Sequence, residues 1–319
     1  MHVIHGHKHV LPEHRGTAVA IGNFDGVHRG HRALIAEAKA QARVKRVPAA
    51  AMVFEPHPRE FFQPDVQQFR LTPLKRKLVL LEKLGLDLVF VEPFDAELAA
   101  LPAEAFIERV LVAGLGVTHV VIGYDFYFGH KRGGNPELMV RMGEELGFGV
   151  TVMPPVAEDG EAFSSSGIRL HIAQGDVKGA AHMLGDYWRV SGRVIGGARR
   201  GTGMGFPTAN LAMPKGTTLG HGIYAVRVHV DGYVYGAAAY LGTRPTFDDG
   251  APLLEVFLFD FNGDLYGSTI DVAFIGFIRE ELKFDSVATL VRRMDSDATV
   301  ARTMLAAAPD AFPMLGKVD

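Results

Sequence analysis

Cysteine is absent from this sequence of 319 residues. That absence excludes a disulfide framework, a thiolate zinc site, an iron–sulfur cluster and a cysteine nucleophile. It agrees with a reducing compartment, and we expect a cytoplasmic protein. An apolar run of about 18 residues is also missing, so no membrane-spanning helix and no membrane partner are expected.

An excess of charge of either sign is missing as well. Lysine and arginine number 33 and aspartate and glutamate 36, which gives a formal net charge of −3. This balance provides no basic surface for nucleic acid, so we expect no nucleic-acid partner. A hydrophobic content of 48% and a charged content of 22% exclude a disordered, collagenous or coiled-coil chain. The sequence does not set the oligomeric state, and a homo-oligomer stays an open alternative.

The opening segment, MHVIHGHKHVLPEHRG, is rich in histidine and lacks the apolar stretch of a signal peptide. Nothing in the spacing of its histidines fixes the geometry of a metal site. We therefore expect a solvated segment or an edge strand there.

Hydrophobic periodicity divides the chain into two parts. Strands expected at 17–24, 47–54, 86–94, 118–123 and 148–156 alternate with helices expected at 31–44, 71–85, 101–116 and 135–147. This alternation predicts an α/β domain, a Rossmann-like parallel sheet with helices on both faces. Two short helices, at 166–174 and 176–184, follow it.

The second part reads as a small antiparallel β-barrel with a terminal helix. Its strands are expected at 187–195, 222–232, 233–242, 253–261 and 269–277, and its helix at 286–307. Turns rich in Gly, Asp and Pro separate the strands. We place the boundary between Gly185 and Tyr187, which gives domains of residues 1–185 and 186–319.

The segment IGNFDGVHRGHRALI runs from the first strand through a glycine-rich turn into a helix. His28 and His31 lie three residues apart and share one helix face. The free N–H groups and the dipole of a helix N-terminus suit phosphate, and two histidines could steady charge that builds on phosphorus. An isolated H-x-G-H is more typical of a polar helix cap. Here the motif follows the first strand of an α/β pattern, where such sheets bind ligands.

GNFDGVHRGH resembles the signature of the HxGH nucleotidyltransferases, in particular the adenylyltransferase half of bacterial bifunctional riboflavin kinase/FAD synthetases. Those enzymes carry a second motif, S-S-T/S-x-I-R, which residues 164–169 (SSSGIR) resemble. The resemblance implies that His28, His31 and Arg169 stabilise the transition state. It also implies an ATP site that includes Gly22, Asn23, Phe24, Asp25, Gly26, Asp125, Ser165 and Ser166.

Two further stretches resemble loops of this family, FEPHPREFF (54–62) and GYDFYFGHKRGG (123–134). The resemblance implies flavin contacts from Phe54, Pro56, Pro58, Phe62 and Phe128. Aromatic side chains offer an isoalloxazine ring a large flat apolar contact. For Phe54, core packing is an equally good interpretation.

The second part contains GGARRGTGMGFPTANL (196–211), which resembles the riboflavin kinase signature. The resemblance implies that Thr208 and Asn210 hold Mg²⁺ and ATP phosphates. Hydroxyl and amide oxygens are ligands that this hard cation accepts. It also implies that the glycine-rich loop folds over the phosphates through Gly201, Gly203 and Gly205.

Glu255 lies in the apolar stretch LEVFLFDF, where the family has the base that takes the riboflavin 5′-hydroxyl proton. Burying a charge in such a strand is costly unless the charge is paired or lies at the opening of a binding site. A glutamate of an edge strand that faces water would give the same sequence pattern. Two positions depart from the family pattern. Tyr240 stands where Asn is usual, and Phe257 where His is usual.

The resemblance implies a bifunctional enzyme of FAD biosynthesis with riboflavin, FMN and ATP as substrates and Mg²⁺ as cofactor. The C-terminal domain would phosphorylate riboflavin to FMN, and the N-terminal domain would adenylylate FMN to FAD with release of pyrophosphate. Because Thr208, Asn210 and Glu255 are present, we expect both activities; the alternative that Tyr240 and Phe257 favour is a single-activity adenylyltransferase whose degenerate barrel only binds flavin. Two different functions also fit parts of the pattern, a flavin-binding regulator and an HxGH transferase for a pantetheine or nicotinamide phosphate.

Overall fold

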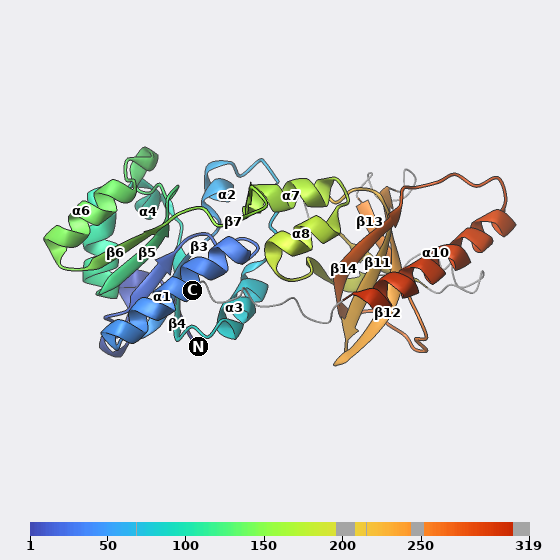
Figure 1. Cartoon of the computed structure of the whole chain (residues 1–319), viewed down its shortest axis with the longest axis horizontal. Coiled ribbons are helices and arrows are strands. Elements are labelled where there is room, and N and C mark those ends of the chain that lie inside the picture. Colours follow the sequence, from blue (N-terminus) through green and yellow to red (C-terminus); the bar gives the residue numbers. More distant parts are fainter. Residues whose placement is uncertain (68, 196–207, 215, 244–251, 309–319) are drawn as a thin grey trace. The chain divides into compact units, whose positions relative to one another are not determined.

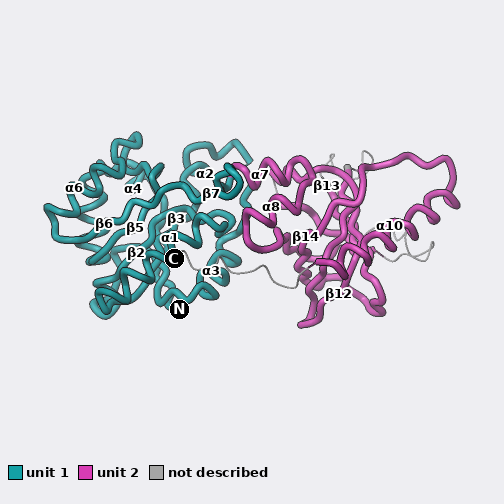
Figure 2. The backbone as a smooth tube through the Cα atoms, viewed as in Figure 1, with its two compact units in different colours: residues 1–165 teal, residues 166–319 magenta. Residues whose placement is uncertain are grey.

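The computed structural model describes residues 1–319 except 68, 196–207, 215, 244–251 and 309–319 (Figure 1). Contacts divide the chain into two compact units, Met1–Ser165 and Ser166–Asp319 (Figure 2). Helix α8 (Val177–Leu184) and nearly all of α7 (Ser165–Ala173) belong to the second unit by this criterion. The domain boundary at residue 185 stays a prediction.

A six-stranded sheet forms the centre of the first unit, in the order β1-β4-β3-β2-β5-β6. Every neighbouring pair is parallel, which confirms the predicted architecture. The edge strand β1 comes from the histidine-rich segment, so the edge-strand interpretation is correct. The strands are β1 (His2–His5), β2 (Ala18–Ile21), β3 (Ala49–Glu55), β4 (Leu88–Pro93), β5 (His119–Gly123) and β6 (Gly149–Met153).

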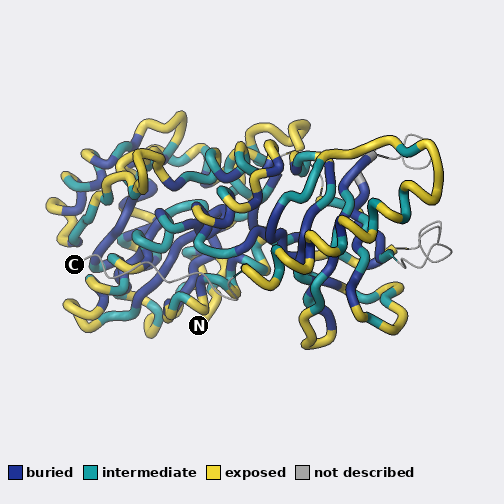
Figure 3. Tube along the Cα trace, turned by 45° about the vertical axis from the view of Figure 1, so that its right-hand side comes forward, coloured by how far each residue is buried: buried dark blue, intermediate teal, exposed yellow. Residues whose placement is uncertain are grey.

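Helices cover both faces of this sheet because its strands are apolar on both sides. Alternate residues of β2 enter different cores. Ala18 and Ala20 pack with α1 (Arg29–Lys45) and α3 (Leu74–Lys83). Val19 and Ile21 pack with the π-helical segment η3 (Phe106–Leu115) and with α6 (Pro136–Leu146). Figure 3 shows the buried strands between more exposed helices.

Shorter elements complete the first unit. They are η1 (His7–His9), η2 (Pro12–His14), α2 (Pro58–Phe62), α4 (Ala96–Ala100), α5 (Ala103–Ala105), η4 (His130–Arg132), β7 (Ala157–Glu158) and β8 (Glu161–Ala162). The stretch 54–62, predicted as a loop, therefore ends in the helix α2. The His57 side chain caps that helix by accepting a hydrogen bond from the Arg59 N–H at 3.1 Å.

The second unit contains a closed antiparallel barrel in the order β10-β13-β12-β11-β14-β9. The predicted barrel is confirmed, although β10 was not among the expected strands. Trp188, Phe274 and Tyr224 pack ring against ring, with centroids 5.0 and 5.4 Å apart. The strands are β9 (Arg189–Ile195), β10 (Thr208–Ala212), β11 (Gly222–Val230), β12 (Tyr233–Thr243), β13 (Pro252–Leu258) and β14 (Thr269–Arg279).

The terminal helix α10 (Val287–Ala307) is fixed to the barrel by a buried ion pair. The Asp297 carboxylate accepts hydrogen bonds from Arg279 Nε at 3.0 Å and Nη2 at 2.7 Å, and Arg293 lies 3.2 Å away. The Asp297 side chain is 5% exposed and that of Arg279 is 12% exposed. Removing one partner would leave an uncompensated buried charge, which makes this pair a strong tether.

Candidate active sites

The first site lies where the strand order of the sheet reverses. From β2 the chain continues to β3 on one side, whereas β5 and β6 lie on the other side. In open α/β sheets, ligands bind outside the carboxyl ends of the two strands at such a switch point. The segments that follow β2 and β5 are the two predicted nucleotide-binding segments, Gly22–Gly26 and the loop with Asp125. The fold therefore brings them to one place.

The β2–α1 loop, residues 22–28, has an unusual backbone. Phe24 and Val27 have φ angles of 49° and 46°, and Gly26 has 91°. Left-handed conformations of non-glycine residues are uncommon and cluster at functional sites. The Phe24 side chain is fully buried, and its ring centroid lies 5.1 Å from that of His31. A contact between Phe24 and ATP would therefore use its backbone.

His28 and His31 form a stacked pair at the start of α1, with ring centroids 3.6 Å apart. His28 is the N-cap, and its Nδ1 accepts a hydrogen bond from the His31 N–H at 3.3 Å. An imidazole that accepts through Nδ1 in its neutral form carries its proton on Nε2. His28 thus keeps an N–H donor. A Cβ at Gly30 would lie 3.2 Å from the His28 ring, so this position favours glycine.

Both imidazoles are held in the neutral form. Burial, aided by Arg32, lowers the pKa of His28 to about 4. Burial, followed by the charges of His28 and Lys77, lowers the pKa of His31 well below its usual value. The His31 Nδ1 atom is buried and has no hydrogen-bond partner within the described residues. At neutral pH the pair therefore offers neutral hydrogen-bonding groups beside the N-terminus of a helix.

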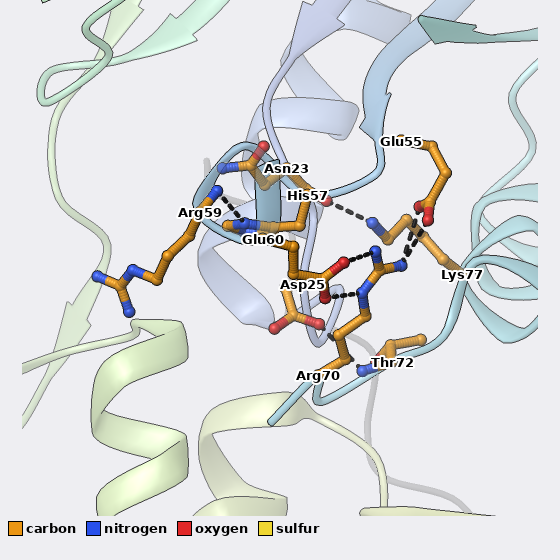
Figure 4. Close-up of polar contacts among 9 residues, drawn as sticks. All are labelled: Asn23, Asp25, Glu55, His57, Arg59, Glu60, Arg70, Thr72 and Lys77. Carbon is orange, nitrogen blue, oxygen red and sulfur yellow. Dashed lines mark hydrogen bonds and ion pairs between the residues drawn. The ribbon is translucent and has the colours of Figure 1, made fainter. Parts of the chain in front are cut away.

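The second motif meets the first through Ser165. Its hydroxyl donates a hydrogen bond to the Asp25 carbonyl at 2.8 Å. The Asp25 carboxylate accepts a hydrogen bond from the N–H group of Leu71 at 3.3 Å. It accepts another from the N–H group of Thr72 at 3.0 Å (Figure 4). Asp25, predicted to bind ATP, is thus an anchor of the loop in this geometry. Arg169 follows Ser165 by four residues on α7 and so shares its helix face.

The predicted flavin contacts divide into surface and core residues. Phe62 is 63% exposed and packs against Phe61 and Phe94, with ring centroids 5.3 and 5.7 Å away. Pro56 and Asp125 are exposed and Pro58 is half-buried. By contrast, two of the predicted contacts, Phe54 and Phe128, are buried in the core with Phe106.

Sequence reasoning missed a charged cluster beside the first site (Figure 4). Arg70 bonds to Glu55, with Nη1 2.7 Å from Oε1, and also to Glu60. Lys77 is buried, and its Nζ donates a hydrogen bond to the Asn23 carbonyl at 2.7 Å. One signal in the sequence could have found Lys77. Lys77 lies between Leu74 and Leu81 on the apolar face of α3. A lysine on the face that packs against the core is unusual and marks the residue for attention.

The second site lies on one face of the barrel. The register places Glu255 of β13 opposite Asn210 of β10 on one side and opposite Tyr240 of β12 on the other. Thr208, two residues before Asn210, points to the same face because side chains alternate along a strand. The structure therefore brings the predicted residues Thr208, Asn210 and Glu255 of two strands to one face, with Tyr240 of β12 beside them. Gly201, Gly203 and Gly205 lie outside the described residues.

The donor set on β10 fits a magnesium ion. Asn210 is 4% exposed, and its Oδ1 atom has no hydrogen-bond partner in the described parts of the chain. A buried amide oxygen without a partner is costly unless a ligand completes its bonding. The Thr208 hydroxyl is the second oxygen on this face. Hard cations accept such neutral oxygens together with phosphate and water.

Tyr240 and Phe257, the two residues that depart from the family pattern, each have a local structural explanation. The Tyr240 hydroxyl donates a hydrogen bond to Glu281 Oε1 at 2.7 Å, so the tyrosine links β12 to the segment after β14. Phe257 is half-buried and packs with Phe259, whose ring centroid is 5.6 Å away, and with the cluster under α10. Neither side chain displaces Asn210 or Glu255 from its register position.

A parallel α/β unit with a histidine pair at a helix N-terminus, joined to a closed barrel with an oxygen-rich face, is the architecture expected of a nucleotide-dependent transferase. The FAD synthetase family model matches residues 10–167, and the riboflavin kinase family model matches residues 184–305. The chain belongs to the bifunctional riboflavin kinase/FMN adenylyltransferase family. It is a bifunctional enzyme of FAD biosynthesis, with FAD synthetase and riboflavin kinase parts.

Three curated relatives carry the description bifunctional riboflavin kinase/FMN adenylyltransferase. That of Pseudomonas fluorescens is 39% identical over 312 residues, covering 98% of this chain and 99% of the relative. That of Haemophilus influenzae is 38% identical over 300 residues, covering 94% and 96%. That of Bacillus subtilis is 36% identical over 304 residues, covering 93% and 95%.

A solved structure from Streptococcus pneumoniae, described as a macrolide-efflux protein, is similar over 95% of this chain and 99% of its own. The sequence identity is 30% and the TM-score 0.83. The efflux description applies to that protein. None of the helices in the described ranges combines the length and the apolar character that crossing a membrane requires.

Proposed function

We propose that adenylyl transfer takes place at the start of α1 and phosphoryl transfer on the Thr208–Asn210–Glu255 face of the barrel. The observation that carries the first assignment is the buried, stacked pair His28 and His31 at the topological switch point. The observation that carries the second is the Asn210 amide oxygen, which lies next to Glu255 in the register and has no hydrogen-bond partner among the described residues. Both reactions consume ATP, and we assign them to the cytoplasm.

In the proposed adenylyl transfer, a phosphate oxygen of FMN attacks the α-phosphorus of ATP, and pyrophosphate leaves with the electrons of the broken P–O bond. The nucleophile is already ionised, so no strong base is needed. The His28 Nε2–H and the free N–H groups of α1 would stabilise the charge that develops on the phosphoryl oxygens. Ser165, Ser166 and Arg169 would hold the leaving phosphates, and for Ser165 the contact with the β2–α1 loop supports this role.

In the proposed phosphoryl transfer, Glu255 accepts the proton of the riboflavin 5′-hydroxyl while that oxygen attacks the γ-phosphorus of ATP, and ADP leaves. Thr208 and Asn210 would hold Mg²⁺, which when bound neutralises phosphate charge. Catalysis here consists mostly of positioning and charge stabilisation. Glu255 is half-buried at the level of Asn210, which supports its role as the base.

For the flavin, we propose Phe62, Pro56 and Pro58 as the groups that contact the ring of FMN, since these side chains lie at least partly at the surface. Because Phe54 and Phe128 are buried, we place them beneath the surface that Phe62, Pro56 and Pro58 form. Asp125 is exposed after β5 and would face the nucleotide.

Two reciprocal variants test these assignments. Each purified variant receives ATP, Mg²⁺ and either riboflavin or FMN, and the flavins are separated by chromatography. His28→Ala should lower FAD formation from FMN by about a hundredfold or more and leave FMN formation intact. Glu255→Ala should do the reverse.

Three results would contradict the assignments. Loss of both activities in one folded variant would refute the separation of the two sites. FAD made from riboflavin by Glu255→Ala would remove Glu255 from its role. A native protein that converts FMN but not riboflavin would implicate Tyr240 and Phe257.

A further inference from the structure

Lys77 is a buried cation that no motif accounts for. The residue is 4% exposed, and its ammonium group donates to the Asn23 carbonyl at 2.7 Å. An ammonium has three N–H donors, and among the described residues the Lys77 ammonium has one acceptor, this carbonyl. Burying a charge without full pairing costs stability. A cost of this kind is typical of residues kept for function.

The Asn23 carbonyl belongs to the β2–α1 loop, which carries the left-handed residues Phe24 and Val27. Two groups from the start of the α3 region hold that loop. Lys77 bonds to it from the helix, and the Thr72 N–H bonds to Asp25 (Figure 4). A strained backbone conformation persists only where the contacts around it hold it in place. The segment from Thr72 to Lys77 therefore acts as a clamp on the loop that leads to His28.

Lys77 also balances the charge of this region. Its ammonium faces the carboxylates of Asp25, Glu55 and Glu60 and the guanidinium of Arg70. Burial lowers the pKa of Lys77, and the Asp25 and Glu55 carboxylates oppose that change. Its charge reaches His31, whose pKa it helps to lower. Lys77 thus supplies one of the positive charges that balance these carboxylates next to the place proposed for a polyphosphate.

We propose that Lys77 is a positioning residue for adenylyl transfer. It holds the β2–α1 loop through the Asn23 carbonyl and places a positive charge behind the N-terminus of α1, where the polyphosphate of ATP would bind. This inference rests on the proposed placement of adenylyl transfer at His28 and His31. The charge acts through the loop and through space, without contact with the reacting atoms.

The test compares Lys77→Met, Lys77→Arg and the control Lys75→Met in the full chain. Lys75 is exposed on the same helix. Lys77→Met should lower kcat/KM for FAD formation from FMN by about tenfold to a hundredfold, the range expected for a misplaced catalytic group. Lys77→Arg, which keeps the charge, should recover part of this loss. Lys75→Met should match the native protein, and all three should form FMN normally.

A readout specific to charge comes from two inhibitors of FAD formation, inorganic pyrophosphate and AMP. Pyrophosphate carries more negative charge, so its inhibition constant should rise more than that of AMP in Lys77→Met. If the two inhibition constants rise equally and Lys77→Arg recovers no kcat/KM, Lys77 acts only through packing and the proposal is overturned. Native FAD formation in Lys77→Met would overturn it too.

Two additions keep the result decisive. If Lys77→Met does not fold, Lys77→Gln keeps a polar donor without the charge and takes its place. His28→Ala is assayed in parallel. If His28→Ala still forms FAD, the proposed site is wrong. If His28→Ala is inactive and Lys77→Met is native-like, only the inference about Lys77 fails.

Discussion

In the α/β unit the candidate reactive groups stand on a loop and a helix end, whereas in the barrel they stand on two neighbouring strands. His28 depends on contacts that Lys77, Thr72 and Ser165 bring to the loop before it from distant parts of the sequence. Asn210 and Glu255 are juxtaposed by strand register alone. The first site should therefore respond to changes far outside its motif, and the second to changes in the barrel as a whole.

The largest effect that sharpens this comparison should follow from Asp297→Ala. The variant leaves Arg279 buried without its carboxylate, so the barrel should lose about 3 kcal/mol of unfolding free energy. Trp188, the single tryptophan, lies in the barrel, and its fluorescence during urea unfolding reports this loss. Asp295→Ala, an exposed position on the same helix, is the control. An equal loss in that control, or unchanged barrel stability, would contradict the tether.

A smaller effect should be a loss of stability at low pH that occurs in the α/β unit and not in the barrel. The folded unit holds the pKa of His28 at about 4 against 6.5 for the free side chain. As the pH falls from 6.5 toward 4, the unfolded chain binds a proton that the folded unit excludes, so stability falls. Between pH 7 and 5 this loss is about 2 kcal/mol for His28. Urea unfolding followed by circular dichroism measures it.

The matched variants for this pH test are His28→Asn, which keeps a capping side chain, and His9→Asn at an exposed position. The first should remove the His28 share of the pH-dependent loss, and the second should keep it. The transition reported by Trp188 fluorescence should be the same in both variants. A pH dependence left unchanged by His28→Asn would show that His28 is not held neutral by the fold.

The smallest effect concerns the barrel face. Asn210→Ala removes one oxygen from the proposed Mg²⁺ site, and the Mg²⁺ concentration for half-maximal FMN formation should rise about tenfold, as for one bond to a charged group. FAD formation from FMN should keep its Mg²⁺ dependence. Asn262→Ala, an exposed asparagine in the same unit, is the control. An unchanged Mg²⁺ requirement in Asn210→Ala would place the cation elsewhere.

Much of the fold could be predicted because strand and helix periods differ clearly along this sequence. The parallel sheet, the barrel and the terminal helix are as expected. Helix α2 was missed because it is only five residues long and is surrounded by prolines typical of a loop. Strand β10 was missed because its sequence, TANLA, is short and has little apolar alternation.

The sites could be predicted in part. The motifs gave His28, Glu255 and Asn210, and the structure gives their neighbours. No local pattern indicates that Asn210, Glu255 and Tyr240 stand in one row, because pairing between strands is not encoded in any one strand. Contacts such as that of Lys77 with Asn23 join distant segments and follow only from the tertiary fold.

The two strand orders also determine when each unit can close as the chain leaves the ribosome. In the sheet, β2 can pair with β3, and β4 can follow as soon as it is made. The barrel closes only when β14 pairs with both β11 and β9, so β9, which also pairs with β10, keeps one edge open until the last strand is made. An open strand edge invites pairing with another chain. Synthesis of β14 therefore removes the last open strand edge of the barrel.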